Sequence, residues 1–278
     1  MRHLYRHARN LLTALTVPDA VVQVEPHLYL GAAAESMFLT LAISWLISFG
    51  YQWDYIRNNS ILSMNGYNNV CVGWDNPPAR YIAASLYPFV IFFQCRFTAT
   101  IAIFYARRFK TRPLFVAVAQ FFDICYVAAL AASSNIFVVR PADCATCVRP
   151  HTALFIGIIS TFLPVNVLYY ATNRLSRWQR VFLAYFITAS VGLAVCLAIN
   201  VANFDPNVIG PKNTVPPGLT AFFDFSWFAL LGLNSSFLPH ASDLLIHLHV
   251  EEHEEPSRAE PKQAPVGVGA WRYRIVCG

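Results

Sequence analysis

Residues 181–202 read VFLAYFITASVGLAVCLAINVA, a run without one charged side chain. An α-helix of about 20 mostly apolar residues crosses the roughly 30 Å hydrocarbon core of a bilayer. The run therefore predicts a membrane-spanning helix over about 180–202. Comparable stretches predict five more spans, at about 31–53, 80–106, 113–135, 151–172 and 219–241. The expected fold class is an all-α membrane protein, a bundle of six transmembrane helices.

The composition of the whole chain agrees with this interpretation. Of its 278 residues, 56% are hydrophobic and only 13% are charged, and the mean hydropathy is +0.44. Soluble domains average roughly a quarter charged residues, so this chain has too few charges to cover a soluble surface. Seven cysteines are also too few for a small secreted scaffold held by disulfides.

The positions of the basic residues predict the orientation in the membrane. Lys and Arg are concentrated in the N-terminal tail, at 107–112, at 174–180 and in the C-terminal tail. Loops rich in Lys and Arg stay in the cytosol, so we expect cytosolic N- and C-termini. The loops 54–79, 136–150 and 203–218 are then luminal. We divide the chain into a cytosolic N-terminal segment (1–30), the six-helix domain (31–245) and a polar, disordered cytosolic tail (246–278).

The predicted luminal loops contain groups that are modified in the secretory pathway. Asn58-Asn59-Ser60 is a glycosylation sequon with Asn58 as the acceptor. Cys71, Cys144 and Cys147 also fall on this side, where thiols are oxidised. We expect a disulfide between Cys144 and Cys147, or one that joins this pair to Cys71. No second Cys or His pair has the spacing of a zinc site, and we expect no metal and no cofactor.

Ionisable residues inside the spans are the first candidates for function. A charge near the centre of a bilayer costs about 2.5–3.5 kcal/mol on insertion scales, and such residues usually face the bundle and pair. Arg96, Asp123 and Asp224 are the residues concerned. A rise of 1.5 Å per residue places Arg96 and Asp123 at nearly equal depths. We therefore predict an ion pair between them, either architectural or part of a site that binds the head group of a lipid substrate.

A second group lies at the luminal mouth of the bundle. It contains Asp75, Arg80, His151 and Asp224. If the chain is an enzyme, His151 is the candidate general base, because a histidine titrates near neutral pH. Asp224 or Asp75 would orient its ring, and Arg80 would hold a phosphate. In the alternative interpretation, His151 is a structural hydrogen-bonding anchor at the interface.

The order of several motifs resembles one known family. Cys71 precedes Pro77-Pro78-Ala79-Arg80-Tyr81, which opens the second span, and Arg96 follows inside that span. Further on come Asp123, the His151–Ile156 stretch HTALFI, the 178–182 stretch WQRVF and Asp224-Phe225. Over about residues 35–245 this order resembles the family of the second post-GPI-attachment-to-proteins factor. The wider superfamily includes the damage-regulated autophagy modulators of lysosomes.

The resemblance implies a multi-pass protein of the Golgi or endoplasmic reticulum membrane. Its role would be GPI-anchor lipid remodelling, in the step that reacylates lyso-GPI with a saturated fatty acid. The chain would be the lyso-GPI acyltransferase or its obligatory membrane-protein partner. The lipid substrate would belong to GPI-anchored proteins, and no nucleic acid is involved. The alternative is a non-catalytic regulator of lysosomes or other endomembranes, of the autophagy-modulator type.

Overall fold

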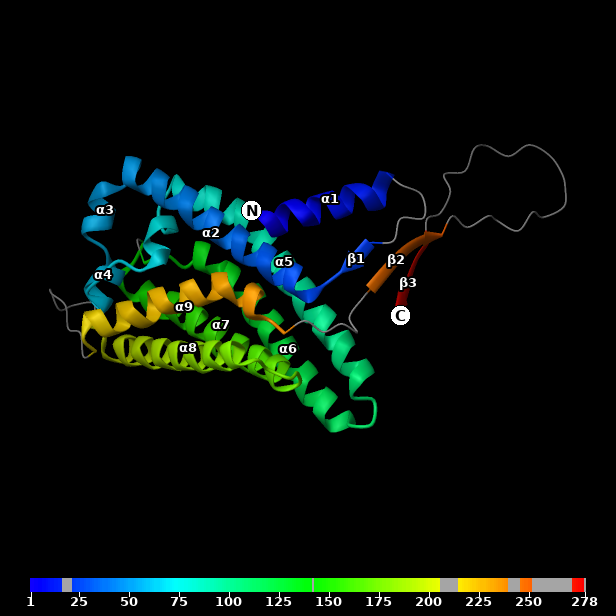
Figure 1. Cartoon of the computed structure of the whole chain (residues 1–278). Helices are drawn as coiled ribbons and strands as arrows, with labels where there is room; N and C mark the ends of the chain where they lie inside the picture. Colours follow the sequence, from blue (N-terminus) through cyan, green and yellow to red (C-terminus); the bar gives the residue numbers. More distant parts are fainter. Residues whose placement is uncertain (17–21, 142, 206–214, 240–245, 252–271, 278) are drawn as a thin grey trace, which may run out of the picture.

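The structure is a computed structural model that describes residues 1–16, 22–141, 143–205, 215–239, 246–251 and 272–277. Six long helices form its body (Figure 1). They are α2 (Pro26–Tyr51), α5 (Ala79–Arg108), α6 (Pro113–Ser133), α7 (Val148–Ala171), α8 (Arg177–Asn203) and α9 (Pro217–Phe237). Shorter helices are α1 (Arg2–Thr16), α3 (Trp53–Arg57), α4 (Ser60–Asn65), η1 (Val70–Trp74), η2 (Ser134–Phe137) and η3 (Ala145–Cys147). The strands are β1 (Val22–Val24), β2 (Ile246–Glu251) and β3 (Arg272–Cys277).

The long helices form a closed bundle. Each packs against the next in chain order, and α9 packs back on α2. Five helices in the described part of the chain are long and apolar enough to cross a membrane: α2, α5, α6 together with η2, α7 and α8. The chain thus has the architecture expected of a multi-pass α-helical membrane protein.

Helix α9 corresponds to the sixth predicted span. It has 21 residues, with Asp224, Asn234 and three serines among them, and it is not one of these five helices. Asp224 and Asn234 are both buried, at 1% and 0% exposure. Asp224 and Asn234 therefore face the interior of the bundle, where other helices cover them. Six spans, and the orientation of the termini, remain predictions.

Local chemistry accounts for the helix boundaries. Pro26 and Pro113 stand in the first turns of α2 and α6, where the missing N–H of proline costs nothing. Ser176 begins α8 with a capping box that it forms with Gln179. The first span begins at Pro26, earlier than the predicted residue 31. Pro239 lies beyond the end of α9 and not inside the sixth span, whereas Pro88 and Pro164 lie within α5 and α7.

Two features at the ends of the chain were not anticipated by the sequence patterns. Helix α1 lies outside the bundle against α2. The carboxylate of Glu35 accepts hydrogen bonds from the backbone N–H groups of His3 and Leu4, at 3.0 and 2.9 Å. Glu35, the charged residue within the first predicted span, is thus satisfied by α1. Strands β1, β2 and β3 form a small antiparallel sheet; residues 252–271 and 278 of the predicted tail lie outside the described residues.

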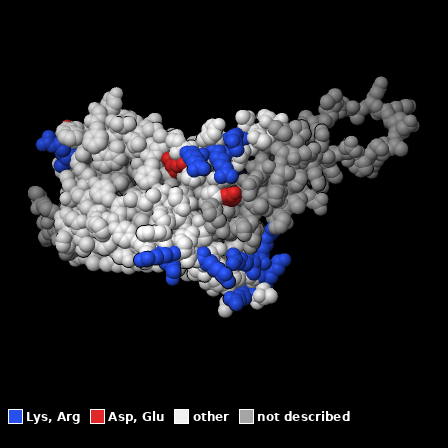
Figure 2. Space-filling model, viewed as in Figure 1, with Lys and Arg blue, Asp and Glu red and all other residues white. Residues whose placement is uncertain are grey.

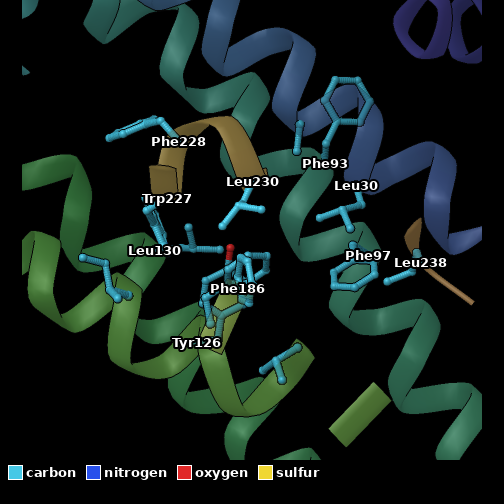
Figure 3. Packing of buried hydrophobic residues seen from close by; sticks show 14 of the residues in the cluster. Leu30, Phe93, Phe97, Tyr126, Leu130, Phe186, Trp227, Phe228, Leu230 and Leu238 are labelled. Carbon is cyan, nitrogen blue, oxygen red and sulfur yellow. The ribbon is translucent and has the colours of Figure 1, made fainter. Parts of the chain in front are cut away.

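Aromatic side chains fill the centre of the bundle. Figure 3 shows Phe97 of α5, Tyr126 of α6, Phe186 of α8 and Trp227 of α9 converging from different helices. Tyr126 packs on Phe162 of α7 with ring centroids 4.9 Å apart. In a bilayer the hydrophobic effect does not drive one helix against another, so close packing of this kind holds the bundle together.

The outer surface of the bundle is apolar as well. Many large hydrophobic side chains point outward, among them Leu46, Leu114, Phe121, Ile124 and Val195. Soluble monomers rarely expose continuous apolar patches larger than a few hundred Å². The surface between the two ends of the helices is thus suited to contact with lipid.

Candidate functional site

The candidate site lies at the end of the bundle that carries α3 and α4, far from the sheet (Figure 1). Asp75 follows η1, and His151 stands in the first turn of α7. Both are buried, at 2% and 3% exposure. His151 Nε2 lies 3.8 Å from Asp75 Oδ1. The fold therefore brings together two of the three predicted catalytic residues, from segments that are far apart in the sequence.

The hydrogen bond that Nδ1 makes defines the tautomer of the His151 ring. His151 Nδ1 lies 3.2 Å from the carbonyl oxygen of Val139. A carbonyl only accepts hydrogen bonds, so Nδ1 must carry the hydrogen. In the neutral ring the lone pair is then on Nε2, the nitrogen that faces Asp75. His151 thus has the tautomer of a general base, with Nε2 as the basic atom.

The carboxyl group of Asp75 has a raised pKa because it is buried. Burial raises the pKa of Asp75 to about 6, against the opposing effects of His151, a hydrogen bond from Tyr55 and the charge of Arg140. Tyr55 Oη donates to Asp75 Oδ2 at 3.2 Å, and burial raises the pKa of Tyr55, so that it stays protonated. Asp75 Oδ1 has no hydrogen-bond partner among the described residues and faces His151 Nε2 at 3.8 Å without a hydrogen bond.

Asp224 belongs to a neighbouring polar pair. Its Oδ2 accepts a hydrogen bond of 2.9 Å from Tyr67 Oη. Its Oδ1 has no hydrogen-bond partner among the residues that the structure describes. The free, fully buried thiol of Cys71 lies within the electrostatic influence of both Asp75 and Asp224, and its pKa is raised by burial and by these charges. Asp75, rather than Asp224, is thus the partner of His151.

An internal cavity of about 50 Å³ adjoins His151. Such a volume holds roughly four water-sized groups. Its walls come from α2, α5, α6, α7 and α9, and His151 and Cys71 lie among mostly apolar and aromatic residues. Three polar atoms in the wall are buried without a hydrogen-bond partner in the described part of the chain: Trp74 Nε1, Trp227 Nε1 and Gln94 Oε1. An apolar cavity with a few polar points is typical of a site for a small or lipid-like ligand.

The predicted substrate-binding residues lie elsewhere. Arg80 stacks over the ring of Tyr81 at 5.1 Å and is absent from the cavity wall. Arg96 is exposed and stacks over Phe92 at 5.5 Å.

Asp123 is buried on α6, and within the described residues it forms no ion pair with Arg96. The predicted pair is therefore wrong. Equal depth does not place two side chains on facing sides of their helices, and the inward side of α5 is occupied by residues such as Phe93 and Phe97.

The cysteines and the sequon are placed as follows. Cys144 and Cys147 are bonded to each other, whereas Cys71 is free. Of the two predicted alternatives, the disulfide within the loop is thus the one that forms. Asn58 is exposed at the end of α3, as a glycan acceptor has to be, and the glycan itself stays a prediction. No group of metal-ligating side chains occurs in the described ranges.

Four residues of the site were not predicted from the sequence: Tyr55, Tyr67, Arg140 and Trp227. Tyr55 and Tyr67 lie between α2 and α5, on the two sides of α4, and each donates to one of the buried carboxyl groups. Arg140 pairs with Asp143 in the loop before α7. A buried carboxyl group needs a hydrogen-bond donor. The tyrosines in the same loop as Asp75 were therefore the sequence signal that could have identified its partner. The loop tyrosine that would pair with Asp224 could not be selected without the fold.

Comparisons with known proteins add no assignment, since no protein-family model, no curated protein and no solved structure matches the chain. The likeness to the post-GPI-attachment factor family therefore remains a resemblance of motifs.

Proposed function

We propose that the chain is a lipid-remodelling factor of the secretory pathway that returns a saturated acyl chain to lyso-GPI anchors in the Golgi or endoplasmic reticulum membrane. In this proposal the chain itself carries the acyltransferase site. One observation supports it above the others: His151, which faces the buried Asp75, borders an apolar cavity inside a bundle with a lipid-compatible surface. The motif resemblance supplies the substrate class.

The geometry suits transfer of an acyl group to a hydroxyl. Nε2 of His151 would take the proton from the lyso-lipid hydroxyl while the oxygen attacks the carbonyl carbon of an acyl ester or thioester. A carbon–oxygen bond forms, the bond to the leaving oxygen or sulfur breaks, and the leaving group receives the proton from His151. The cavity would hold part of an acyl chain, and the Trp227 N–H is a donor available to a carbonyl oxygen.

Mass spectrometry of GPI-anchor lipids from cells that lack the protein tests this proposal. Rescue with the wild-type chain should restore saturated diacyl anchors, and rescue with His151→Asn should leave lyso-GPI. Asparagine can still donate a hydrogen bond toward Val139 but has no basic nitrogen. Arg80→Gln is the matched control, because Arg80 lies outside the cavity wall.

A second assay separates the enzyme from an obligatory partner. The purified chain in liposomes, with a lyso-GPI analogue and an acyl donor, should form the diacyl product. Normal anchor lipids in cells carrying a folded His151→Asn variant would contradict the catalytic site. Two results together would favour the regulator: normal anchor lipids in cells that lack the chain, and a lysosomal location of the protein in wild-type cells.

A further inference from the structure

A groove lies between α1, α2 and α9, at the end of α2 opposite to the candidate catalytic site. It is made of two adjoining hollows that share His3, Ser235 and Ser236. Figure 2 shows basic and acidic atoms side by side over this region of α1 and α2. Neither hollow is used by the proposed reaction.

The first hollow, of about 270 Å³, is polar and basic. Arg2, Arg6 and His27 line it, next to Leu28 and the shared residues. Arg2 and Arg6 are four residues apart on α1, so they lie on the same face of that helix. His27 and Leu28 belong to the first turn of α2. The basic side chains are therefore at the level where the first predicted span begins, which is the depth of lipid head groups.

The acidic residues nearby neutralise part of the positive charge of this hollow. Glu25 contacts His27 at 2.9 Å and Arg6 at 3.9 Å, and Glu35 contacts His3 at 2.9 Å. Arg2 forms no ion pair or hydrogen bond with any residue that the structure describes. Its guanidinium group, with the weakly paired Arg6 beside it, is left to bind an anion from outside the protein.

The second hollow, of about 380 Å³, continues along α2 toward the membrane interior. The residues that line it include Gly31, Ala34, Phe38, Leu39 and Gly232. Phe38 and Leu39 are 39% and 37% exposed, so the hollow opens to the lipid side of the bundle. The groove thus has a basic head at the start of α2 and a mostly apolar continuation in the span, with Glu35 already bound by α1.

We propose that this groove binds one anionic phospholipid. The phosphate lies between Arg2 and Arg6, and an acyl chain lies along Phe38 and Leu39. The complementarity of charge selects an anionic head group, and the direction of the groove selects a membrane lipid over a soluble phosphate compound. The bound lipid packs against both α1 and α2 and fastens α1 to the bundle.

Native mass spectrometry of the detergent-purified full-length chain tests the proposal. The probe is phosphatidylglycerol, compared with phosphatidylcholine that has the same acyl chains. One basic residue near a lipid phosphate contributes about 1 kcal/mol, so Arg2→Gln and Arg6→Gln should each weaken phosphatidylglycerol binding about fivefold. Arg9→Gln is the matched control, since Arg9 is exposed on the same helix and lines neither hollow.

A variant of the apolar part provides an independent test. Ser236 is exposed and lines both hollows, so Ser236→Phe should block the groove and abolish selective binding. Leu233→Phe is its control, because Leu233 is exposed on α9 outside the groove. Two results would overturn the proposal. One is equal binding of phosphatidylglycerol and phosphatidylcholine to the wild-type chain, and the other is a loss of phosphatidylglycerol binding in Arg9→Gln as large as that in Arg2→Gln and Arg6→Gln. If Ser236→Phe fails to fold, the arginine variants alone decide the result.

Discussion

At the scale of single residues, the most informative contact is that between His151 and Asp75. The His151→Asn variant retains a donor that can reach Val139 and loses the base. Loss of general-base catalysis typically lowers a rate 10²- to 10⁴-fold. We expect acyl transfer to fall by about this factor while the thermal midpoint of the detergent-purified protein changes little. A variant with both full activity and normal stability would remove His151 from the reaction.

Asp75 makes a prediction about pH and stability. Its pKa is about 6 in the folded protein, against an ordinary value of 3.8. The folded state therefore binds more protons than the unfolded state between these values, and the stabilisation is present at low pH and lost as pH rises through 6. The total effect is about 3 kcal/mol.

Thermal unfolding in detergent at several pH values measures this effect. As the pH rises from 4.5 to 6.5, the thermal midpoint of the wild-type protein should decrease relative to that of Asp75→Asn, which has no carboxyl group to ionise at this position. Parallel pH profiles of the two proteins would show that Asp75 is not the group responsible.

At the scale of elements, a buried amide network joins α7 to α9. Asn234 donates to Asn166 Oδ1 at 2.7 Å and accepts from Tyr170 Oη at 3.1 Å. Asn234→Ala leaves both partners unpaired inside the bundle, and an unpaired buried group costs about 1–3 kcal/mol. We expect the thermal midpoint of Asn234→Ala to fall clearly below that of Leu233→Ala, whose side chain is exposed. An equal midpoint would mean that the network contributes nothing to α7–α9 packing.

The packing of α1 against α2 depends on Gly31, which has no side chain. A Cβ at Gly31 would lie 2.5 Å from the ring of His3, whereas a Cβ at Gly50 on the same helix would meet nothing within 4 Å. Gly31→Ala should therefore displace the first turn of α1, and Gly50→Ala should not. Hydrogen–deuterium exchange of residues 2–16 reports the difference, as faster exchange in Gly31→Ala alone. Unchanged exchange in both variants would mean that His3 moves aside without loosening α1.

At the scale of the whole molecule, the distribution of basic residues predicts how the bundle sits in the membrane. The basic turns between α5 and α6 and between α7 and α8 lie at the same end as the sheet (Figures 1 and 2). With that end in the cytosol, tags on either terminus should be digested by protease added outside sealed microsomes. Asn58 should carry a glycan that Asn58→Gln lacks. A protected terminus would reverse or invalidate the predicted orientation.

The sequence by itself determined the long helices and the membrane-protein class. A run such as 181–202 has no charge to keep it in water, and a helix satisfies every backbone hydrogen bond within the segment. The starts of α2, α6 and α8 depend on adjacent residues, namely Pro26, Pro113 and the Ser176–Gln179 box, so they need no knowledge of neighbouring helices. His151 and Asp75 were identified as candidates because titratable residues at the mouth of an apolar bundle are few.

The tertiary structure alone decided which of these residues meet. Depth along a helix can be counted from the sequence, but the direction of a side chain around the helix depends on its neighbours, and so Arg96 lies outside while Asp123 lies inside. The partner of His151 had two candidates, and the packing of the loop around η1 selected Asp75 while Tyr67 bound Asp224. Contacts between residues far apart in the chain follow from how the helices pack, and helix packing in a bilayer rests on shape complementarity, which hydrophobic patterns do not encode.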